Sequence, residues 1–160
     1  HKYVLAFFIL LLLFASGIKI HSVLRAPKIS DWNYHQLQRI DCSKTNFSFV
    51  VFGDNKNSVK TFDNLISKLN KEDILFAVDD GDLVYDGEKE KFRFFLNQIK
   101  NLSKPLLTVL GNHGVKEEGR AAYYGFFGPF YYSFAVGKSY FIILDDANER
   151  NLDDEQLDRK

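Results

Sequence analysis

Three short apolar runs alternate with two longer segments in which apolar residues recur at helical spacing. The runs cover residues 47–52, 74–78 and 106–110, and their length is typical of buried strands. Between them, residues 58–70 and 88–101 each place apolar side chains along one face of a helix. Strands and helices that alternate in this order form a parallel sheet with right-handed crossovers. The pattern therefore predicts an α/β fold built on a β-α-β-α-β unit.

A hairpin is predicted after this unit. A loop rich in glycine and aromatic residues first extends through Gly128-Pro129. Residues 131–136 and 139–144 then form two strand-like runs, and Gly137-Lys138 between them suits a tight turn. We therefore expect a loop followed by an antiparallel pair of strands.

The first 20 residues form a separate apolar unit. Residues 3–18 carry no charge, and Lys2 and Lys19 bracket them. A helix of that length spans about 24 Å, slightly less than a hydrocarbon core of about 30 Å. We expect either a transmembrane anchor or a cleaved signal peptide. The apolar run is nearly long enough for an anchor, and small residues near its end are spaced for cleavage of a signal peptide. Either one predicts a membrane-anchored or exported protein, with the side of the membrane left open.

Residues 21–44 are mostly polar and predict a linker between the apolar unit and the globular part, residues 45–160. Within this linker, Ser30-Asp31 can cap a short helix that continues to Ile40. Trp32 and Leu37 would then pack on the domain or at a membrane interface.

Composition adds few constraints. Hydrophobic residues make up 46% and charged residues 26% of the chain, as is ordinary for a globular protein. Basic and acidic residues number 21 each, so the sequence has no excess of positive charge for binding nucleic acid. The single cysteine, Cys42, cannot form an internal disulfide. The 16 phenylalanines predict an aromatic-rich core, and nothing here indicates an oligomeric state.

Each of the first three predicted strands is followed by glycine and then by a residue that can bind a metal ion. These motifs are Gly53-Asp54, Gly81-Asp82 and Gly111-Asn112-His113. Ligands of open α/β sheets bind beyond the carboxyl ends of the strands, so we expect Asp54, Asp82 and Asn112 around one crevice, with His113 at its rim. Oxygen ligands with imidazole suit Mn, Fe, Zn or Mg, and a bridging carboxylate can hold two such ions.

In their order and spacing, the motifs resemble those of the calcineurin-like metallophosphoesterases over roughly residues 45–160. That family has Asp-x-His, then Gly-Asp, then Gly-Asn-His followed by an acidic residue. The resemblance implies a two-sheet sandwich flanked by helices and hydrolysis of a phosphomonoester or phosphodiester by a metal-activated water. It also implies that Asp82 bridges two divalent ions, that Asp54 and Asn112 each bind one of them, and that His113 is the general acid.

Two positions depart from the family pattern. Lys56 replaces the metal-binding histidine, and an ammonium has no lone pair with which to bind a metal. It either extends into solvent or holds a substrate phosphate. Gly114 replaces the acidic residue after Gly-Asn-His. These departures favour an alternative, a degenerate, non-catalytic, membrane-tethered interaction module of the same fold. A phosphatase with an aspartyl nucleophile is disfavoured, because Lys56 also stands where that class needs a second aspartate.

The resemblance further implies that the histidines completing both metal sites follow Lys160. We therefore expect the full-length protein to be a metallophosphoesterase and these 160 residues alone to be inactive. We also expect apolar faces to be left uncovered where part of the second sheet would lie. Asp79 and Asp80 add negative charge beside Asp82, and their orientation is left open.

Overall fold

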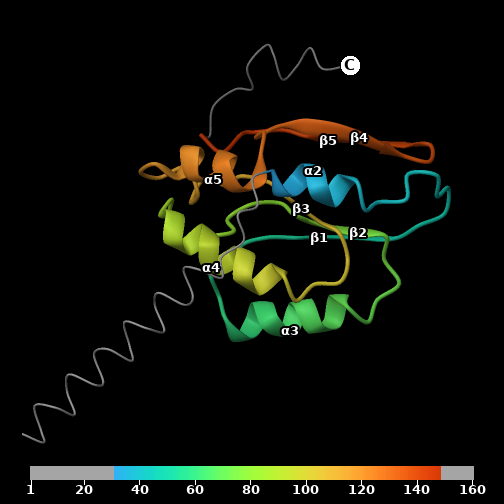
Figure 1. The fold of residues 1–160 in the computed structure, drawn as a ribbon, viewed down its shortest axis with the longest axis horizontal. Coiled ribbons are helices and arrows are strands. Elements are labelled where there is room, and N and C mark those ends of the chain that lie inside the picture. The colour runs from blue at the N-terminus through green and yellow to red at the C-terminus, as the bar shows by residue number, and fades with distance from the viewer. Residues whose placement is uncertain (1–30, 149–160) are drawn as a thin grey trace, which may run out of the picture.

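The computed structural model describes residues 31–148 and has a parallel sheet, an antiparallel hairpin and four helices within that range (Figure 1). The apolar unit predicted for residues 1–20 lies outside the described residues. Between residues 31 and 148, no helix is long and apolar enough to cross a membrane. In chain order the elements are α2 (Trp32–Leu37), β1 (Phe49–Phe52), α3 (Lys60–Leu69), β2 (Phe76–Asp79), α4 (Lys89–Ile99), β3 (Leu106–Thr108), α5 (Gly119–Phe127), β4 (Tyr132–Val136) and β5 (Ser139–Ile143).

The first sheet confirms the β-α-β-α-β prediction. Its strands lie in the order β1-β2-β3, and both neighbouring pairs are parallel. Phe52, Asp79 and Thr108 are in register at the carboxyl ends of the three strands. The loops that leave these strands therefore start at one edge of the sheet.

The sheet is covered on both faces (Figure 1). Helices α3 and α4 lie on one face, where their buried phenylalanines pack together. The β4–β5 hairpin, also as predicted, covers the other face. There the ring of Phe76 meets the rings of Phe134 and Phe141 edge-on, with centroids 5.6 and 5.3 Å apart. The hairpin leaves apolar surface open, as the sequence predicted, since Val51, Tyr140 and Ile142 are each more than half exposed.

Helix α5 was not predicted, because its segment was assigned to a loop. Tyr123 and Phe127, four residues apart on this helix, are both fully buried. This spacing is helical, but the glycines at positions 119, 125 and 128 obscure it in the sequence. Gly128 ends the helix with a positive φ of 94°, which glycine adopts without steric strain.

Helix α2 is the short helix that the sequence predicted after Ser30-Asp31, within residues 21–44, and it ends at Leu37 and not at Ile40. The short helix forms, with Asp31 as its N-cap, and it packs on β3. The indole Nε1 of Trp32 donates a hydrogen bond to the Leu106 carbonyl at 2.7 Å. The Asn33 side chain accepts from the Thr108 backbone N–H at 2.8 Å and donates to the Thr108 carbonyl at 3.2 Å. These side chains satisfy the free edge of β3 as a further strand would, so α2 is part of the fold.

Candidate metal centre

The glycines of the three motifs allow the strand-end loops to approach one another closely. A Cβ atom at Gly111 would overlap the backbone nitrogen and a carboxylate oxygen of Asp82, and one at Gly53 would overlap the Asp80 carboxylate. Gly81 has a φ of 129° and lies against the backbone of Gly111. The Asp54 N–H donates to the Gly81 carbonyl at 3.1 Å, which joins the first loop to the second. Glycine is required at these positions because a Cβ atom would prevent the backbones from approaching one another, and because glycine lets the chain turn sharply where each strand ends.

Substitution of Gly111 should therefore be much more damaging than substitution of a glycine with free space around it. We expect Gly111→Ala to destabilise the fold by about 1–3 kcal/mol through overpacking, and to displace Asp82. Gly125 is the matched control, because nothing lies within 4 Å of its virtual Cβ and it is inside α5. Gly125→Ala should stabilise the protein by about 0.5–1 kcal/mol. Urea unfolding of both variants measures the difference, and equal free energies of unfolding would contradict the close packing.

The structure brings Asp54, Asp82 and Asn112 together along one hollow of about 320 Å³ beyond the strand ends. This is the arrangement that the sequence predicted. Two further carboxylates line the same hollow, those of Asp80 and Asp146. The sequence left the orientation of Asp80 open, and Asp146 was missed because it follows β5, the strand most distant from the first motif in the chain. The hollow is therefore strongly acidic, which favours a cation.

His113 lies beside Asp82 at the margin of this group. Its backbone N–H donates to Asp82 Oδ1 at 3.0 Å, and its Nε2 is 3.8 Å from Asp82 Oδ2. On the other side of the ring, Nδ1 is 2.8 Å from the Tyr85 carbonyl oxygen. A carbonyl can only accept, so Nδ1 carries a proton in this arrangement and Nε2 faces the acidic side.

Lys56 points toward the carboxylates and not into solvent. Its Nζ lies 2.8 Å from Asp54 Oδ1 and 3.3 Å from Asp82 Oδ2, and its side chain is 33% exposed. The hydrogen bond from Lys56 lowers the pKa of the Asp54 carboxyl, and the same bond raises the pKa of the Lys56 ammonium. The pair is therefore charged at neutral pH.

Several residues of these loops adopt left-handed backbone conformations that glycine usually provides. The φ angles are 59° at Asp54, 41° at Lys56, 57° at Asn57 and 55° at Asp82. Each such residue costs about 1–2 kcal/mol, so the surrounding contacts must hold it in place. The Lys56 N–H donates to the Asp82 carbonyl at 2.9 Å, and Asn57 Nδ2 donates to the Lys91 carbonyl at 3.0 Å. The loop that carries Lys56 is thus fixed against the loop that carries Asp82.

Asp79, the other residue whose orientation was left open, is not among the residues that line the hollow. It ends β2 and is fully buried. Burial raises the pKa of its carboxyl well above the usual value, outweighing the opposite effect of the Gly81 backbone. Asp79 therefore favours its neutral form, whereas Asp80, the next residue, lines the hollow.

The donor chemistry of the hollow fits a divalent cation, because carboxylate and amide oxygens are suitable hard ligands. The fit to two ions is incomplete. Within residues 31–148, no three His, Cys, Asp or Glu side chains converge as a metal-binding group. An ammonium also lies within contact distance of both Asp54 and Asp82.

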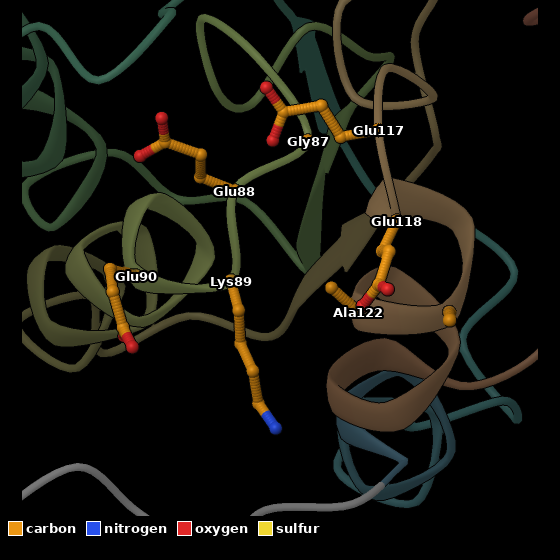
Figure 2. Close-up of a pocket in the computed structure, with 8 residues that line it drawn as sticks. Gly87, Glu88, Lys89, Glu90, Glu117, Glu118 and Ala122 are labelled. Carbon is orange, nitrogen blue, oxygen red and sulfur yellow. The ribbon is translucent and has the colours of Figure 1, made fainter.

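A second hollow, of about 440 Å³, lies between the starts of α4 and α5 (Figure 2). It is lined by Gly87, Glu88, Lys89, Glu90, Glu117, Glu118, Ala121 and Ala122. Figure 2 shows that its carboxylates point in different directions and do not converge on one position. Acidic residues at helix N-termini complement the helix dipole, which accounts for their presence without a ligand.

Comparison with known proteins agrees with the motif analysis. Residues 47–155 match the family model of the calcineurin-like phosphoesterases. A probable cyclic nucleotide phosphodiesterase of Xenorhabdus bovienii is 33% identical over 66 residues, which cover 37% of this chain and 27% of that protein. The matched region thus spans about a quarter of the length of this curated relative.

Proposed function

The chain belongs to the calcineurin-like phosphoesterase family, as its motifs predicted, and on this premise we propose that it hydrolyses a phosphate ester at the acidic hollow. Proteins of this family generally use divalent metal ions. The observation that carries the proposal is that Asp54, Asp82 and Asn112, from three separate strand ends, line one hollow. The name of the bacterial relative favours a phosphodiester over a phosphomonoester.

The residues of the hollow have distinct roles in this proposal. Asp54, Asp82 and Asn112 would hold divalent ions, of Mn, Fe, Zn or Mg. When bound, such ions lower the pKa of a water molecule and neutralise charge on the phosphate oxygens. Lys56, at the margin of the same carboxylates, can donate hydrogen bonds from its ammonium to a phosphate oxygen.

His113 is the proposed general acid. Its Nδ1 proton is directed to the Tyr85 carbonyl, so a second proton, on Nε2, would face the acidic side. Nε2 lies 3.8 Å from Asp82 Oδ2, on the side of the ring that faces the hollow. From there the Nε2 proton can pass to the alkoxide that leaves phosphorus.

The leaving group provides a test of this role in the full-length protein. With Mn²⁺ present, we expect turnover of p-nitrophenyl phosphate and bis(p-nitrophenyl) phosphate, and loss of turnover with a chelator. His113→Gln should lower turnover of phenyl phosphate about a hundredfold but that of the p-nitrophenyl ester far less, because p-nitrophenolate leaves without a proton. His35→Gln, in an exposed position on α2, is the control. An equal loss for both esters would contradict the general-acid role.

A non-catalytic module of the same fold is the second candidate. The ion pairs of Lys56 with Asp54 and Asp82 favour it, because they occupy carboxylates that a metal would need. Metal-dependent turnover by the full-length protein would eliminate this candidate, and its absence would support it. A membrane-anchored or exported location stays a prediction from residues 1–20.

A further inference from the structure

Lys56 is held in the acidic hollow by its own backbone as well as by its charge. Its N–H donates to the Asp82 carbonyl at 2.9 Å, and the next residue, Asn57, donates from its N–H to the Leu83 carbonyl at 3.3 Å. The buried side chain of Asn55 donates to the same Leu83 carbonyl at 3.4 Å. Both neighbours of Lys56 are therefore docked on the Asp82 loop, and its side chain starts beside the carboxylates.

The ammonium lies where an ion shared by Asp54 and Asp82 would be bound. Lys56 Nζ is 2.8 Å from Asp54 Oδ1, and metal–carboxylate bonds are about 2.0–2.2 Å long. A divalent ion on that oxygen would thus lie within about 5 Å of the ammonium, and like charges at this range repel. Asp82 Oδ2 is 3.3 Å from the same nitrogen, so both carboxylates already share one cation.

We propose that the Lys56 ammonium takes the place of one of the two metal ions of the family, so that this protein binds a single divalent ion beside Asp82 and Asn112. This inference rests on the proposed function, because it concerns the same hollow. Asp54 then serves mainly as the counter-ion that holds Lys56, and its 77% exposed side chain allows that role. A phosphate ester would be held between the divalent ion and the ammonium, which donates hydrogen bonds but cannot coordinate and activate a water molecule as a metal ion does.

The test measures how many Mn²⁺ ions the full-length protein binds, by calorimetric titration and by electron paramagnetic resonance. We expect the unmodified protein to bind one Mn²⁺ and to give the spectrum of an isolated ion. In Lys56→His the new imidazole joins Asp54 and Asp82 as a third ligand. That variant should bind two ions and give the spectrum of an exchange-coupled pair. Lys56→Gln, which removes the charge without adding a good ligand, should bind the second ion only weakly.

Lys60→Gln is the matched control, because Lys60 is an exposed lysine at the start of α3, and it should still bind one ion. Two coupled ions in the unmodified protein would overturn the role of Lys56 and leave the proposed function intact. No Mn²⁺ binding by the unmodified protein or by Lys56→His would overturn the metal centre itself, and the proposed function with it. One ion in the unmodified protein and one in Lys56→His would overturn the inference. Removing the repulsion between the ammonium and a second ion would then have had no effect.

Discussion

Replacing Asp82 with asparagine should weaken Mn²⁺ binding by at least about a thousandfold and abolish metal-dependent ester hydrolysis. Loss of a residue that only supports a metal ligand typically lowers affinity 10–100-fold, and Asp82 is proposed as a ligand itself. Its side chain is 14% exposed, so the lost negative charge is only partly replaced by water. Asparagine keeps the shape of the side chain and can still accept the hydrogen bond from the His113 N–H. Calorimetric titration with Mn²⁺ measures the loss of affinity.

The control for this substitution removes the same charge at the other end of the strand. Asp73 is exposed and precedes β2, whereas Asp82 follows it, so Asp73→Asn should bind Mn²⁺ as the unmodified protein does. Unchanged Mn²⁺ affinity in Asp82→Asn would show that the ion binds elsewhere. The hollow would then have to be abandoned as the candidate metal centre.

Replacing Trp32 with alanine should destabilise the fold by about 3–5 kcal/mol, the usual range for removing a large buried aromatic side chain. Trp32 is only 7% exposed, and its indole satisfies the Leu106 carbonyl on the free edge of β3. Alanine would leave both a cavity under α2 and a carbonyl without its partner. The free energy of unfolding in urea reports the effect. Circular dichroism is the suitable signal, because the substitution removes the single tryptophan of the chain and its fluorescence.

Tyr34→Ala is the matched control on the same helix. Tyr34 is 54% exposed and its ring contacts only the neighbouring His35 ring among the aromatic pairs of the described residues, so its loss should change stability by no more than about 0.5 kcal/mol. If Trp32→Ala were no more destabilising than Tyr34→Ala, α2 would be dispensable to the fold. Residues 32–37 would then act only as part of the predicted linker.

The elements that sequence analysis identified are those whose burial follows from local periodicity. The three parallel strands, the helices α3 and α4, and the hairpin each carry an apolar pattern of their own. The glycine motifs were informative for a related reason. The carboxyl ends of parallel strands lie at one edge of the sheet. The residues that follow Gly53, Gly81 and Gly111 therefore come together there, independently of the sequence between the motifs.

The features that the sequence left open or did not predict depend on partners far away in the chain. Trp32 lies in a polar segment, and the carbonyl that it satisfies is 74 residues later. The sequence left open whether Lys56 extends into solvent or holds a substrate phosphate, and the docking of its loop on the Asp82 loop places its side chain beside the carboxylates. Asp146 joins the hollow because the chain returns to the strand ends after β5. Local periodicity thus decides which strands and helices form. Long-range packing decides which charged side chains come together at the strand ends, because those contacts join segments that share no local pattern.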